Sequence, residues 1–579
     1  MVEQLRVTSA DGTNLAVYVQ GVMDAPTVVA VHGYPDNHQV WDGVAAILAK
    51  RLRVVTYDVR GTGESDKPAG SSAYLMDRLV EDLRAVLDAV SPSAPVHLLA
   101  HDWGSIQSWP AVLDPSFRTR ISSFTSISGP SLDQASAWLR SSHRHPGASA
   151  RQLADSFYIA AFQLPVLPEL AGRAGIIDRA LALSSKIGRS AAAVDVVQTR
   201  TEADKINGLG MYRANFLTRL ARPELTSTDV PVQVLAPRSD RFVSVPLQTE
   251  APVPYVTNLR TRVISGGHWV VTDRPEVIAS LTTEFIDHIE GAPETRGLKQ
   301  ARERRPGRFG GQLVVVTGGG RGIGRATALE FARHGADVIV ADINDAAAAE
   351  TVDDLRKLGV DAAAYHLNVS DADAWEQFAK QVRVEHDVPD IIVNNAGIGM
   401  GGPFLGTSVQ DWEKVLGVNV WGVIHGSRLF AKQMVERGQG GHIVNIASAA
   451  AFTPSRIYPA YATSKAAVLM LTECLRAELG REGIGVTAIC PGFIDTDISK
   501  TTVHVGVGEA EQDKLRAHAV ASYGRRNYTP ERLAKHAVRA VGRNKPVAVI
   551  TAESHLFRAV GRFAPPLARQ LSKLDLNKI

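Results

Sequence analysis

The stretch GAPETRGLKQARERRPGRFGG, residues 291–311, divides this sequence into two parts. It is rich in arginine, has proline and glycine towards both ends, and lacks a periodic apolar pattern. Such a composition cannot bury a core, which predicts a solvated linker; a basic surface helix is the alternative. The patterns on its two sides differ, so we expect one domain over 1–290 and another over 312–579.

Length and composition fit this division. With 579 residues, 45% hydrophobic and 21% charged, the chain is too long for one core and has an ordinary globular composition. Its net charge of +3 gives no argument for nucleic-acid binding. The first residues show no signal peptide, and no apolar run is long enough to cross a membrane. Cys474 and Cys490 fit reduced core thiols, so a cytoplasmic protein is expected.

The first half shows the pattern of a parallel α/β sheet. Apolar runs at 27–33, 53–61 and 96–104 alternate with segments of helical period such as 78–90. The third run ends in small residues around Asp102, which permit a sharp turn that lifts this side chain above the sheet. A carboxylate there suits attack on an sp³ carbon, giving an alkyl ester that water hydrolyses. An ordinary helix N-cap is the alternative.

Three further residues stand where such a nucleophile needs support. Asp240 ends the later apolar stretch 230–240, and His268 follows a strand and two glycines in ISGGHWV. The order nucleophile, acid, histidine is the one that this kind of sheet uses in hydrolysis. Tyr34 lies in the HGYP turn after the first buried strand, where a backbone donor to an oxyanion is needed.

On these residues the segment 1–290 resembles epoxide hydrolases of the α/β-hydrolase fold. The matching stretches are HGYPDNHQVWD (32–42), YDVRGTGESDKP (57–68), HDWGS (101–105) and GGHWV (266–270). The resemblance implies that Asp102 is the nucleophile, Asp240 the acid that orients the base, and His268 the base that activates water. The amide of Trp103 and one from the HGYP loop would hold the oxyanion.

The resemblance also implies a helical cap over about 130–225, with one match and one departure. In that family two cap tyrosines donate hydrogen bonds to the epoxide oxygen. The stretch MYRANF nominates Tyr212, whereas the position of the first tyrosine holds Ala161. Tyr158 lies about one turn earlier, on roughly the same helix face, and either substitutes or only packs.

Two related chemistries are disfavoured by single residues. Haloalkane dehalogenases also place Trp after the nucleophile but commonly have Asn where this chain has Tyr34. Fluoroacetate dehalogenases have Arg where this chain has Trp103.

The second half opens with a nucleotide-binding pattern. The apolar run 312–317 leads into GGGRGIG and then a segment of helical period. Glycines let the backbone approach a pyrophosphate, and a helix N-terminus favours its charge. Asp342 ends the next strand, where an acid accepts from the ribose hydroxyls and repels a 2′-phosphate, which favours NAD. Arg321 in the loop keeps NADP open.

A second group of residues has the spacing of an alcohol–ketone site. Tyr461 and Lys465 lie on one helix face, at (i, i+4). A nearby ammonium lowers the pKa of a tyrosine, so its oxygen can accept a proton from an alcohol while hydride leaves carbon. Ser448 would hold the substrate oxygen, and NNAG (394–397) and Asn419 complete the pattern.

Residues 312 to about 550 thus resemble short-chain dehydrogenases/reductases, which implies a Rossmann fold. By that resemblance Tyr461 is the acid/base, Ser448 and Lys465 assist, and Asn419 supports a proton-relay water. Helices near 411–435 and 461–480 would pair with a second copy in a homodimer or homotetramer. The implied cofactor-binding residues, with Asn368 where Asp is usual, are Gly318, Arg321, Gly322, Ile323, Gly324, Asp342, Asn368, Val369, Asn395, Ala396, Gly397, Tyr461, Lys465, Pro491, Gly492 and Thr496.

The whole chain resembles mycobacterial fusions of an epoxide hydrolase with a short-chain dehydrogenase. This implies a bifunctional α/β enzyme that opens a lipid epoxide to a diol and, with NAD or NADP, oxidises an alcohol or reduces a ketone, without a metal ion. The alternative, motivated by Ala161, is that only the dehydrogenase is catalytic and the other half is a lipid-binding scaffold. The tail 555–579 interleaves apolar and basic residues; it either lies on an anionic membrane or packs on its own domain or a dimer partner.

Overall fold

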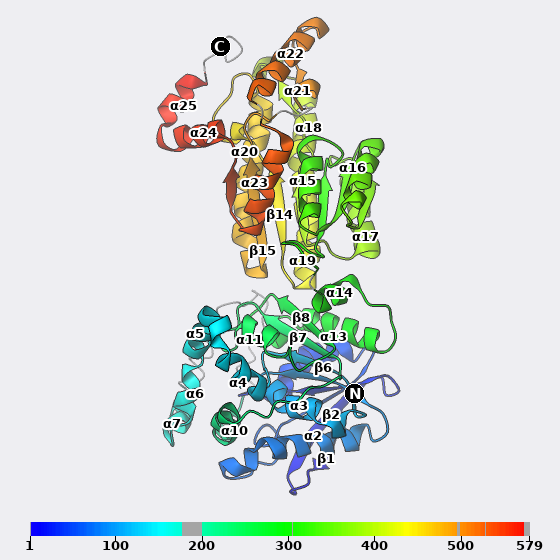
Figure 1. Ribbon diagram of the computed structural model, residues 1–579, viewed down its shortest axis with the longest axis vertical. Helices are drawn as coiled ribbons and strands as arrows, with labels where there is room; N and C mark the ends of the chain where they lie inside the picture. Colours follow the sequence, from blue (N-terminus) through cyan, green and yellow to red (C-terminus); the bar gives the residue numbers. More distant parts are fainter. Residues whose placement is uncertain (1, 176–199, 304, 495–497, 527, 573–579) are drawn as a thin grey trace. The chain divides into compact units, whose positions relative to one another are not determined.

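Two compact units, Met1–Arg302 and Glu303–Ile579, make up the chain (Figure 1). The computed structural model describes residues 2–175, 200–303, 305–494, 498–526 and 528–572. Each unit is an α/β structure with its own sheet and core, as predicted. No helix of the described residues is long and apolar enough to cross a membrane.

An eight-stranded sheet forms the centre of the first unit, in the order β1-β2-β4-β3-β5-β6-β7-β8. Its first two strands run antiparallel, and the strands from β3 to β8 are parallel. The apolar runs of the sequence are strands whose residues are almost all buried. The strands are β1 (Glu3–Thr8), β2 (Asn14–Gly21), β3 (Thr27–Val31), β4 (Arg53–Tyr57), β5 (Val96–His101), β6 (Ile121–Ile127), β7 (Val232–Pro237) and β8 (Leu259–Ile264).

Helices cover both faces of this sheet. One core contains the apolar sides of α1 and α13, and the other those of α2 and α3. A group of helices between β6 and β7 forms the predicted cap, of which 176–199 lie outside the described residues. The helices are α1 (Asp42–Leu48), α2 (Met76–Val90), α3 (Trp103–Leu113), α4 (Leu132–Arg140), α5 (Pro146–Asp155), α6 (Phe157–Phe162), α7 (Leu167–Arg173), α9 (Glu202–Asn207), α10 (Leu209–Ala221), α11 (Val245–Glu250), α12 (Val270–Asp273), α13 (Pro275–Ile289) and α14 (Arg296–Arg302).

Part of the stretch predicted as a linker is folded. Helix α14 lies inside 291–311, belongs to the first unit and buries Leu298 completely. It packs against β8, the last strand of the sheet. Residues 296–302 therefore form a helix, the alternative to a solvated linker, and the burial of Leu298 attaches this helix to the first unit.

The second unit has a seven-stranded parallel sheet in the order β11-β10-β9-β12-β14-β15-β17. The order reverses between β9 and β12, which places a crevice at the carboxyl ends of these strands. Cys490 is buried at the end of β15, whereas Cys474 is exposed, which corrects its prediction as a core thiol. The strands are β9 (Leu313–Thr317), β10 (Asp337–Asp342), β11 (Ala362–His366), β12 (Ile391–Asn394), β14 (Gly441–Ile446), β15 (Ile484–Cys490) and β17 (Val547–Val549), with a separate pair β13 (Met400–Gly401) and β16 (Val503–His504).

Helices α15, α16 and α23 share one core with this sheet, and α17, α19 and α20 share the other. The sheet is therefore doubly wound, with helices on both faces. The helices are α15 (Gly322–Arg333), α16 (Asp345–Lys357), α17 (Ala372–His386), α18 (Val409–Leu416), α19 (Gly422–Arg437), α20 (Pro459–Leu479), α21 (Ile498–Thr501), α22 (Glu509–Arg526), α23 (Pro530–Gly542), α24 (Ala552–Phe563) and α25 (Pro565–Leu571).

Candidate active sites

The turn from β5 to α3 holds Asp102 in a left-handed backbone conformation, with φ of 52° and ψ of −125°. For a residue other than glycine this conformation costs about 1–3 kcal/mol and is typical of functional sites. Its neighbours have to be small: a Cβ on Gly104 would collide with the Val31 carbonyl, and one on Gly129 with the Asp102 carbonyl. Gly104, one of the small residues predicted to permit a sharp turn, is therefore required by the space available.

The structure brings the three predicted catalytic side chains of the first unit together. His268 Nδ1 lies 3.1 Å from Asp240 Oδ2, and His268 Nε2 lies 3.4 Å from Asp102 Oδ2. All three side chains are buried. The histidine ring thus lies between the two carboxylates, as a base shared by a nucleophile and an orienting acid requires.

Electrostatics in this buried group favour the charged forms. Burial alone would lower the pKa of His268, but Asp240 and Asp102 outweigh it and raise this pKa to about 10. Burial likewise disfavours the Asp240 carboxylate, yet His268 and the amides of Phe242 and Val243 hold the pKa of Asp240 below its ordinary value. These shifts favour a protonated His268 imidazole beside the ionised Asp240 carboxylate.

Backbone donors lie on the other side of Asp102. The Tyr34 amide donates to Asp102 Oδ1 at 2.8 Å, and Gly33 has no room for a side chain because a Cβ would meet Asp102. The Trp103 amide lies in the first turn of α3, where amides lack acceptors within the helix. Both amides predicted as oxyanion donors thus belong to the segments that surround Asp102.

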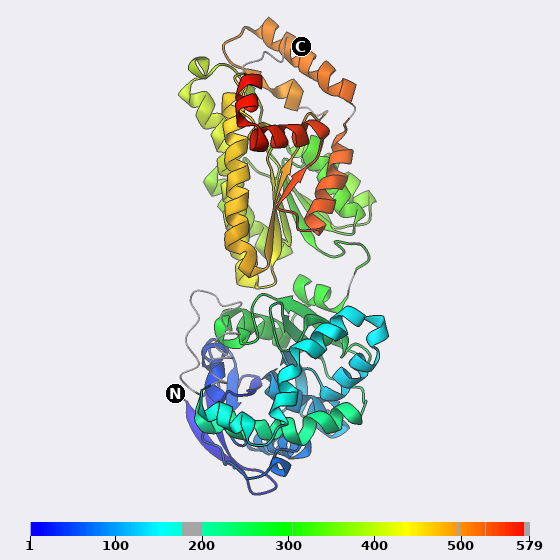
Figure 2. The ribbon, with the colours of Figure 1, turned by 90° about the vertical axis from the view of Figure 1, so that its left-hand side faces the viewer.

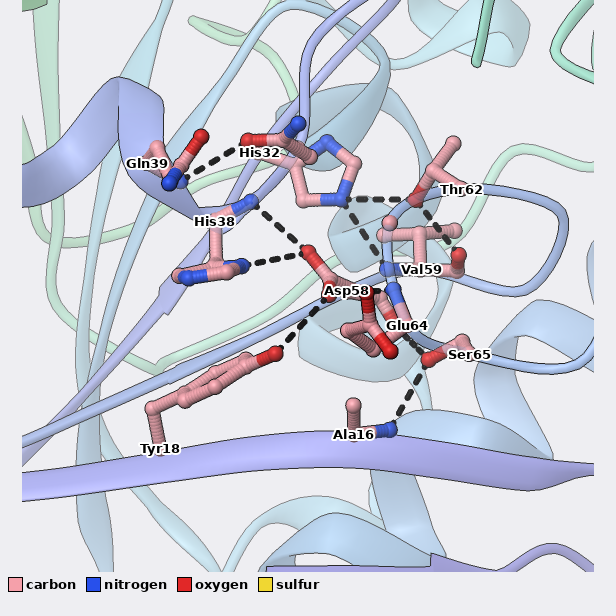
Figure 3. A network of polar contacts seen from close by, with 12 residues as sticks. Ala16, Tyr18, His32, His38, Gln39, Asp58, Val59, Thr62, Glu64 and Ser65 are labelled. Carbon is pink, nitrogen blue, oxygen red and sulfur yellow. Dashed lines mark hydrogen bonds and ion pairs between the residues drawn. The ribbon is translucent and has the colours of Figure 1, made fainter. Parts of the chain in front are cut away.

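A buried polar network holds the HGYP loop in place (Figure 3). His32 donates through Nδ1 to the Gly33 carbonyl and accepts from the Val59 amide through Nε2, both at 2.9 Å. Asp58 accepts from the amide and the ring of His38. Burial disfavours the Asp58 carboxylate, but the hydrogen bond from His38, the nearby His32 and the Glu64 amide together outweigh it and lower the pKa of Asp58. The predicted stretches 32–42 and 57–68 therefore meet in one network.

Two cap tyrosines lie near Asp102. Tyr212 of α10 accepts a hydrogen bond from the Trp103 side chain, and its hydroxyl bonds that of Tyr158 of α6. Burial and the nearby Asp102 charge raise the pKa of both phenols, so both remain protonated donors. The Tyr158 ring also packs on Phe242, which in turn packs on His268.

The departure at Ala161 is explained by the phase of α6. Tyr158 and Phe162 point inward together, and both pack on Tyr212. Phe157 and Ala161 form the exposed side. Residues 158 and 161 therefore lie on different sides of α6, which corrects the expectation of a shared face. A tyrosine at 161 would point to solvent here.

Sequence reasoning missed the buried carboxylates that connect the cap to the sheet. Asp36, just after the HGYP loop, accepts from Arg200 Nε at 2.6 Å and from Trp269 Nε1 at 3.0 Å. Asp204 caps α9 and accepts from the Gly63 amide at 2.8 Å. These contacts join segments far apart in sequence, so no local pattern marks them.

The glycine-rich turn of the second unit fits a dinucleotide. Gly318 has φ of 61°, and a Cβ on Gly324 would collide with the Gly318 carbonyl, so glycine is required at both positions. The turn ends at α15, whose first residues are Gly322 and Ile323, and Arg321 at its N-cap is exposed. This arrangement leaves a bare backbone at a helix N-terminus, which suits a pyrophosphate.

Asp342 lies beside this turn. Its carboxylate accepts from the Gly320 amide at 2.8 Å and from the Asn344 amide at 2.9 Å. Two amides therefore fix the carboxylate next to the turn. An acid there fits ribose hydroxyls and opposes a 2′-phosphate.

Two of the other predicted cofactor residues, Asn395 and Ala396, support the glycine-rich turn. Asn395 donates to the carbonyls of Thr317 and Gly318, and the Ala396 amide donates to Thr317 Oγ1, so both hold the turn in shape. Asn368 Oδ1 accepts from Ser370, and the Val369 carbonyl accepts from Trp375. A Cβ on Gly397 would lie 3.4 Å from Lys465 Nζ.

The predicted alcohol–ketone residues lie together at the start of α20. Ser448 is hydrogen-bonded to Tyr461, and Lys465 Nζ lies 5.8 Å from the centre of the Tyr461 ring. Lys465 donates to the Ile446 carbonyl at 2.9 Å, and burial lowers its pKa to about 8. Burial raises the pKa of Tyr461, which the Ser448 hydrogen bond partly opposes. Asn419 lies in a π-helical turn, as functional residues often do, and donates to Ile398 and Ser464.

The loop predicted to meet the nicotinamide is held by a helix that sequence reasoning did not connect with it. The Pro491 carbonyl accepts from the Ala449 amide, and the Phe493 amide donates to Glu553 Oε1 of α24 at 3.0 Å. A Cβ on Gly492 would collide with Glu553 and Thr551. Thr496, also predicted here, lies outside the described residues.

Two family models match the chain, one in each unit. The model described as "alpha/beta hydrolase fold" covers residues 26–275, and "short chain dehydrogenase" covers 312–504. The protein named "Probable oxidoreductase EphD" from Mycobacterium tuberculosis is 40% identical over 587 residues, which span 98% of each chain. The chain belongs to the EphD family. Because the match spans both units, the EphD relative has the same two folds in the same order.

Other similarities concern the second unit alone. A "C alpha-dehydrogenase" from Sphingobium is 32% identical over 39% of this chain and 76% of its own. A solved short-chain dehydrogenase from Burkholderia phymatum, in complex with NAD, is 30% identical over 46% of this chain and 99% of its own, with a TM-score of 0.41. By the two family models and the full-length match, the chain is an enzyme with a hydrolase-fold unit and a short-chain dehydrogenase unit that takes NAD(P).

Proposed function

We propose that the first unit is an epoxide hydrolase and that the second is an NAD-dependent alcohol–ketone oxidoreductase, with lipids as the substrate class. The position of His268 between Asp102 and Asp240, with Tyr158 and Tyr212 near Asp102, carries the first half of the proposal. A carboxylate nucleophile, an activated water and a donor to a developing alkoxide are the parts that this reaction needs.

The proposed reaction begins at Asp102. Its carboxylate attacks an epoxide carbon, and the C–O bond of the ring breaks. The hydroxyls of Tyr158 and Tyr212 donate hydrogen bonds to the alkoxide oxygen, which takes up a proton supplied in the end by His268. The ester has no negative charge, so one of the two partners that raise the pKa of His268 is lost. His268 can then release its proton, which balances the one gained by the alkoxide, and the ring becomes a base.

Hydrolysis of the ester uses the neutral ring. His268 takes a proton from water, and the hydroxide adds to the ester carbonyl carbon of Asp102. In this proposal the amides of Tyr34 and Trp103 stabilise the oxyanion. The carbonyl then reforms, and the second diol oxygen leaves with a proton from His268. The carboxylic acid so formed at Asp102 passes its proton to His268, which restores the carboxylate and the imidazolium. The sum is one epoxide and one water to one vicinal diol.

Two alternatives lose support at this site. The hypothesis of a non-catalytic scaffold is based on Ala161 at the position of the first cap tyrosine. Tyr158, however, supplies a hydroxyl near Asp102 from another position of the cap. A haloalkane dehalogenase would use the same Asp102, but Tyr34 and the tyrosine pair favour an epoxide oxygen over a halide. Diol formation from styrene oxide, measured for the native protein and for Asp102→Asn, tests the choice. Halide release from a chloroalkane, with no diol from any epoxide, would reverse it.

The second unit uses Tyr461, Ser448 and Lys465. A bound nicotinamide would accept or deliver the hydride. Ser448 orients the substrate oxygen and opposes the rise in the Tyr461 pKa that burial causes, Tyr461 takes or gives the hydroxyl proton, and Lys465 lies beside the Tyr461 ring. We expect NAD to bind better than NADP because Asp342 is an acid beside the ribose site.

We further propose self-association through the second unit. Large apolar side chains are exposed on α18, on α20 and in the turn between α18 and α19; they are Val409, Met470 and Trp421. Burying these against a two-fold copy would remove them from water. The double variant Trp421→Glu, Met470→Glu should be monomeric in light scattering where the native chain is a dimer or tetramer. An equal mass for both proteins would count against this contact.

A further inference from the structure

The outer side of α24 is apolar where a surface helix is normally polar. Leu556, Ala559 and Phe563 fall at one-turn spacing on this side, and Leu556 and Phe563 are 59% and 81% exposed. Leu567 of α25, 46% exposed, is a further apolar group on the next helix. Figure 2 shows both helices, in red, on the outside of the second unit. A surface helix usually turns such a stripe towards a core, so these side chains need a partner.

Apart from Glu553 in the first turn of α24, the charged residues of these two helices are of one sign. Between Ser554 and Ser572 the sequence has three arginines, Arg558, Arg562 and Arg569, and no acidic residue. The acid of α24, Glu553, accepts from the Phe493 amide and so faces its own unit. Arg562 and Arg569 are exposed, whereas Arg558 is half-buried and lies near Cys490 of its own unit. The outer surface is therefore apolar and, through Arg562 and Arg569, cationic, as expected of a segment that binds an anionic interface.

The inner side of α24 packs on both loops of the dehydrogenase site. Gly561 lies so close to the Phe452 carbonyl that a Cβ there would collide with it, and this carbonyl belongs to the turn after Ser448. Glu553 holds the loop after Gly492. The same helix therefore carries the apolar surface on its outer side and, on its inner side, supports the loops predicted to bind the substrate and the nicotinamide.

We propose that this outer side of α24 and α25 docks on an anionic lipid surface. The apolar side chains would enter the boundary between headgroups and acyl chains, and the arginines would bind phosphates. A second copy fits less well, because a two-fold contact would place the same arginines against one another. The idea rests on the proposed function in one respect only: a lipid substrate gives the docking a use beside this site.

Co-sedimentation with vesicles tests the proposal without any turnover. The native chain should bind vesicles of equal parts phosphatidylglycerol and phosphatidylcholine, and should bind pure phosphatidylcholine far less. Arg562→Glu, Arg569→Glu should weaken anionic binding by about twenty-fold or more, at about fivefold for each basic residue at such a surface. Leu556→Ser, Phe563→Ser should also release the protein, and salt should weaken native binding.

A matched control separates this surface from general stickiness. Val384 of α17 is 78% exposed, and Val384→Ser should bind vesicles as the native chain does. NADH binding by every variant reports that the second unit is folded. The proposal is overturned if the native chain does not bind anionic vesicles, or if the double variants bind them as well as the native chain does. If the native chain binds no vesicle and Leu556→Ser, Phe563→Ser lowers the oligomer mass, the surface instead binds a second copy of the chain. Absent diol formation with intact vesicle binding would sink the hydrolase proposal alone.

Discussion

Asp102 shows how much of a catalytic position is made by its neighbours. Its left-handed backbone needs Gly104 and Gly129 nearby, and its charge is balanced by His268 and the Tyr34 amide. The sequence pattern already nominated Asp102, Asp240 and His268, because each follows a buried strand. It did not reveal that the resting histidine is protonated, since this depends on two carboxylates that meet only in the fold.

The charge balance at Asp102 gives the first prediction. Asp102→Asn removes one carboxylate beside His268 and resembles the ester in charge, so the pKa of His268 should fall below its native value of about 10. Selective ¹⁵N-histidine NMR titration measures it. Accordingly, ester formation by the native enzyme should slow as pH rises through about 10, where the imidazolium is lost. An unchanged His268 titration in Asp102→Asn would contradict the switch from acid to base.

The hydroxyl of Tyr158 gives a second prediction at this scale. Tyr158→Phe removes one donor over Asp102 and should lower kcat for epoxide opening by about a hundredfold, the usual cost of one such donor. Ala161→Tyr is the matched control: its side chain would point to solvent, so activity should stay unchanged and should not rescue Tyr158→Phe. Equal rates for native and Tyr158→Phe proteins would make Tyr158 a packing residue.

Helices and strands could be predicted from the sequence where their residues are fully buried, but not where only one or two side chains are buried. The parallel strands β3, β5 and β9 are buried along their whole length, so each leaves an apolar run that a turn residue ends. Helix α14 buries one leucine among arginines, which no periodicity records. The phase of the short α6 is set by packing on Tyr212, so sequence spacing misplaced its faces.

The end of β10 carries a prediction on the cofactor. Asp342→Ala removes an acid held by two amides beside the glycine turn, so the preference for NADH over NADPH should narrow by about tenfold, since like charges a few ångströms apart oppose binding. Fluorescence titration of both cofactors measures it. Tighter NADPH binding by the native protein would show that Arg321 outweighs Asp342.

At the scale of the whole molecule, the two proposed reactions share a functional group. A vicinal diol is the product of the first, and a secondary alcohol is what a Ser448–Tyr461–Lys465 site oxidises. We propose a relay from epoxide through diol to hydroxyketone; two independent activities in one chain are the alternative. Given a lipid epoxide and NAD, the native protein should form hydroxyketone and NADH, and Tyr461→Phe should stop at the diol. Diol alone from both proteins would exclude the relay for that substrate.

The central claim is that Asp102 forms an ester with an epoxide and that His268 drives its hydrolysis. His268→Gln should leave the attack intact and block the second step, so the ester should accumulate. Intact-protein mass spectrometry after incubation with styrene oxide should show one added epoxide mass, which peptide mapping places on Asp102, while Asp102→Asn stays unmodified. An unmodified His268→Gln protein, with an epoxide that the native enzyme turns over, or an adduct on another residue, would contradict the account.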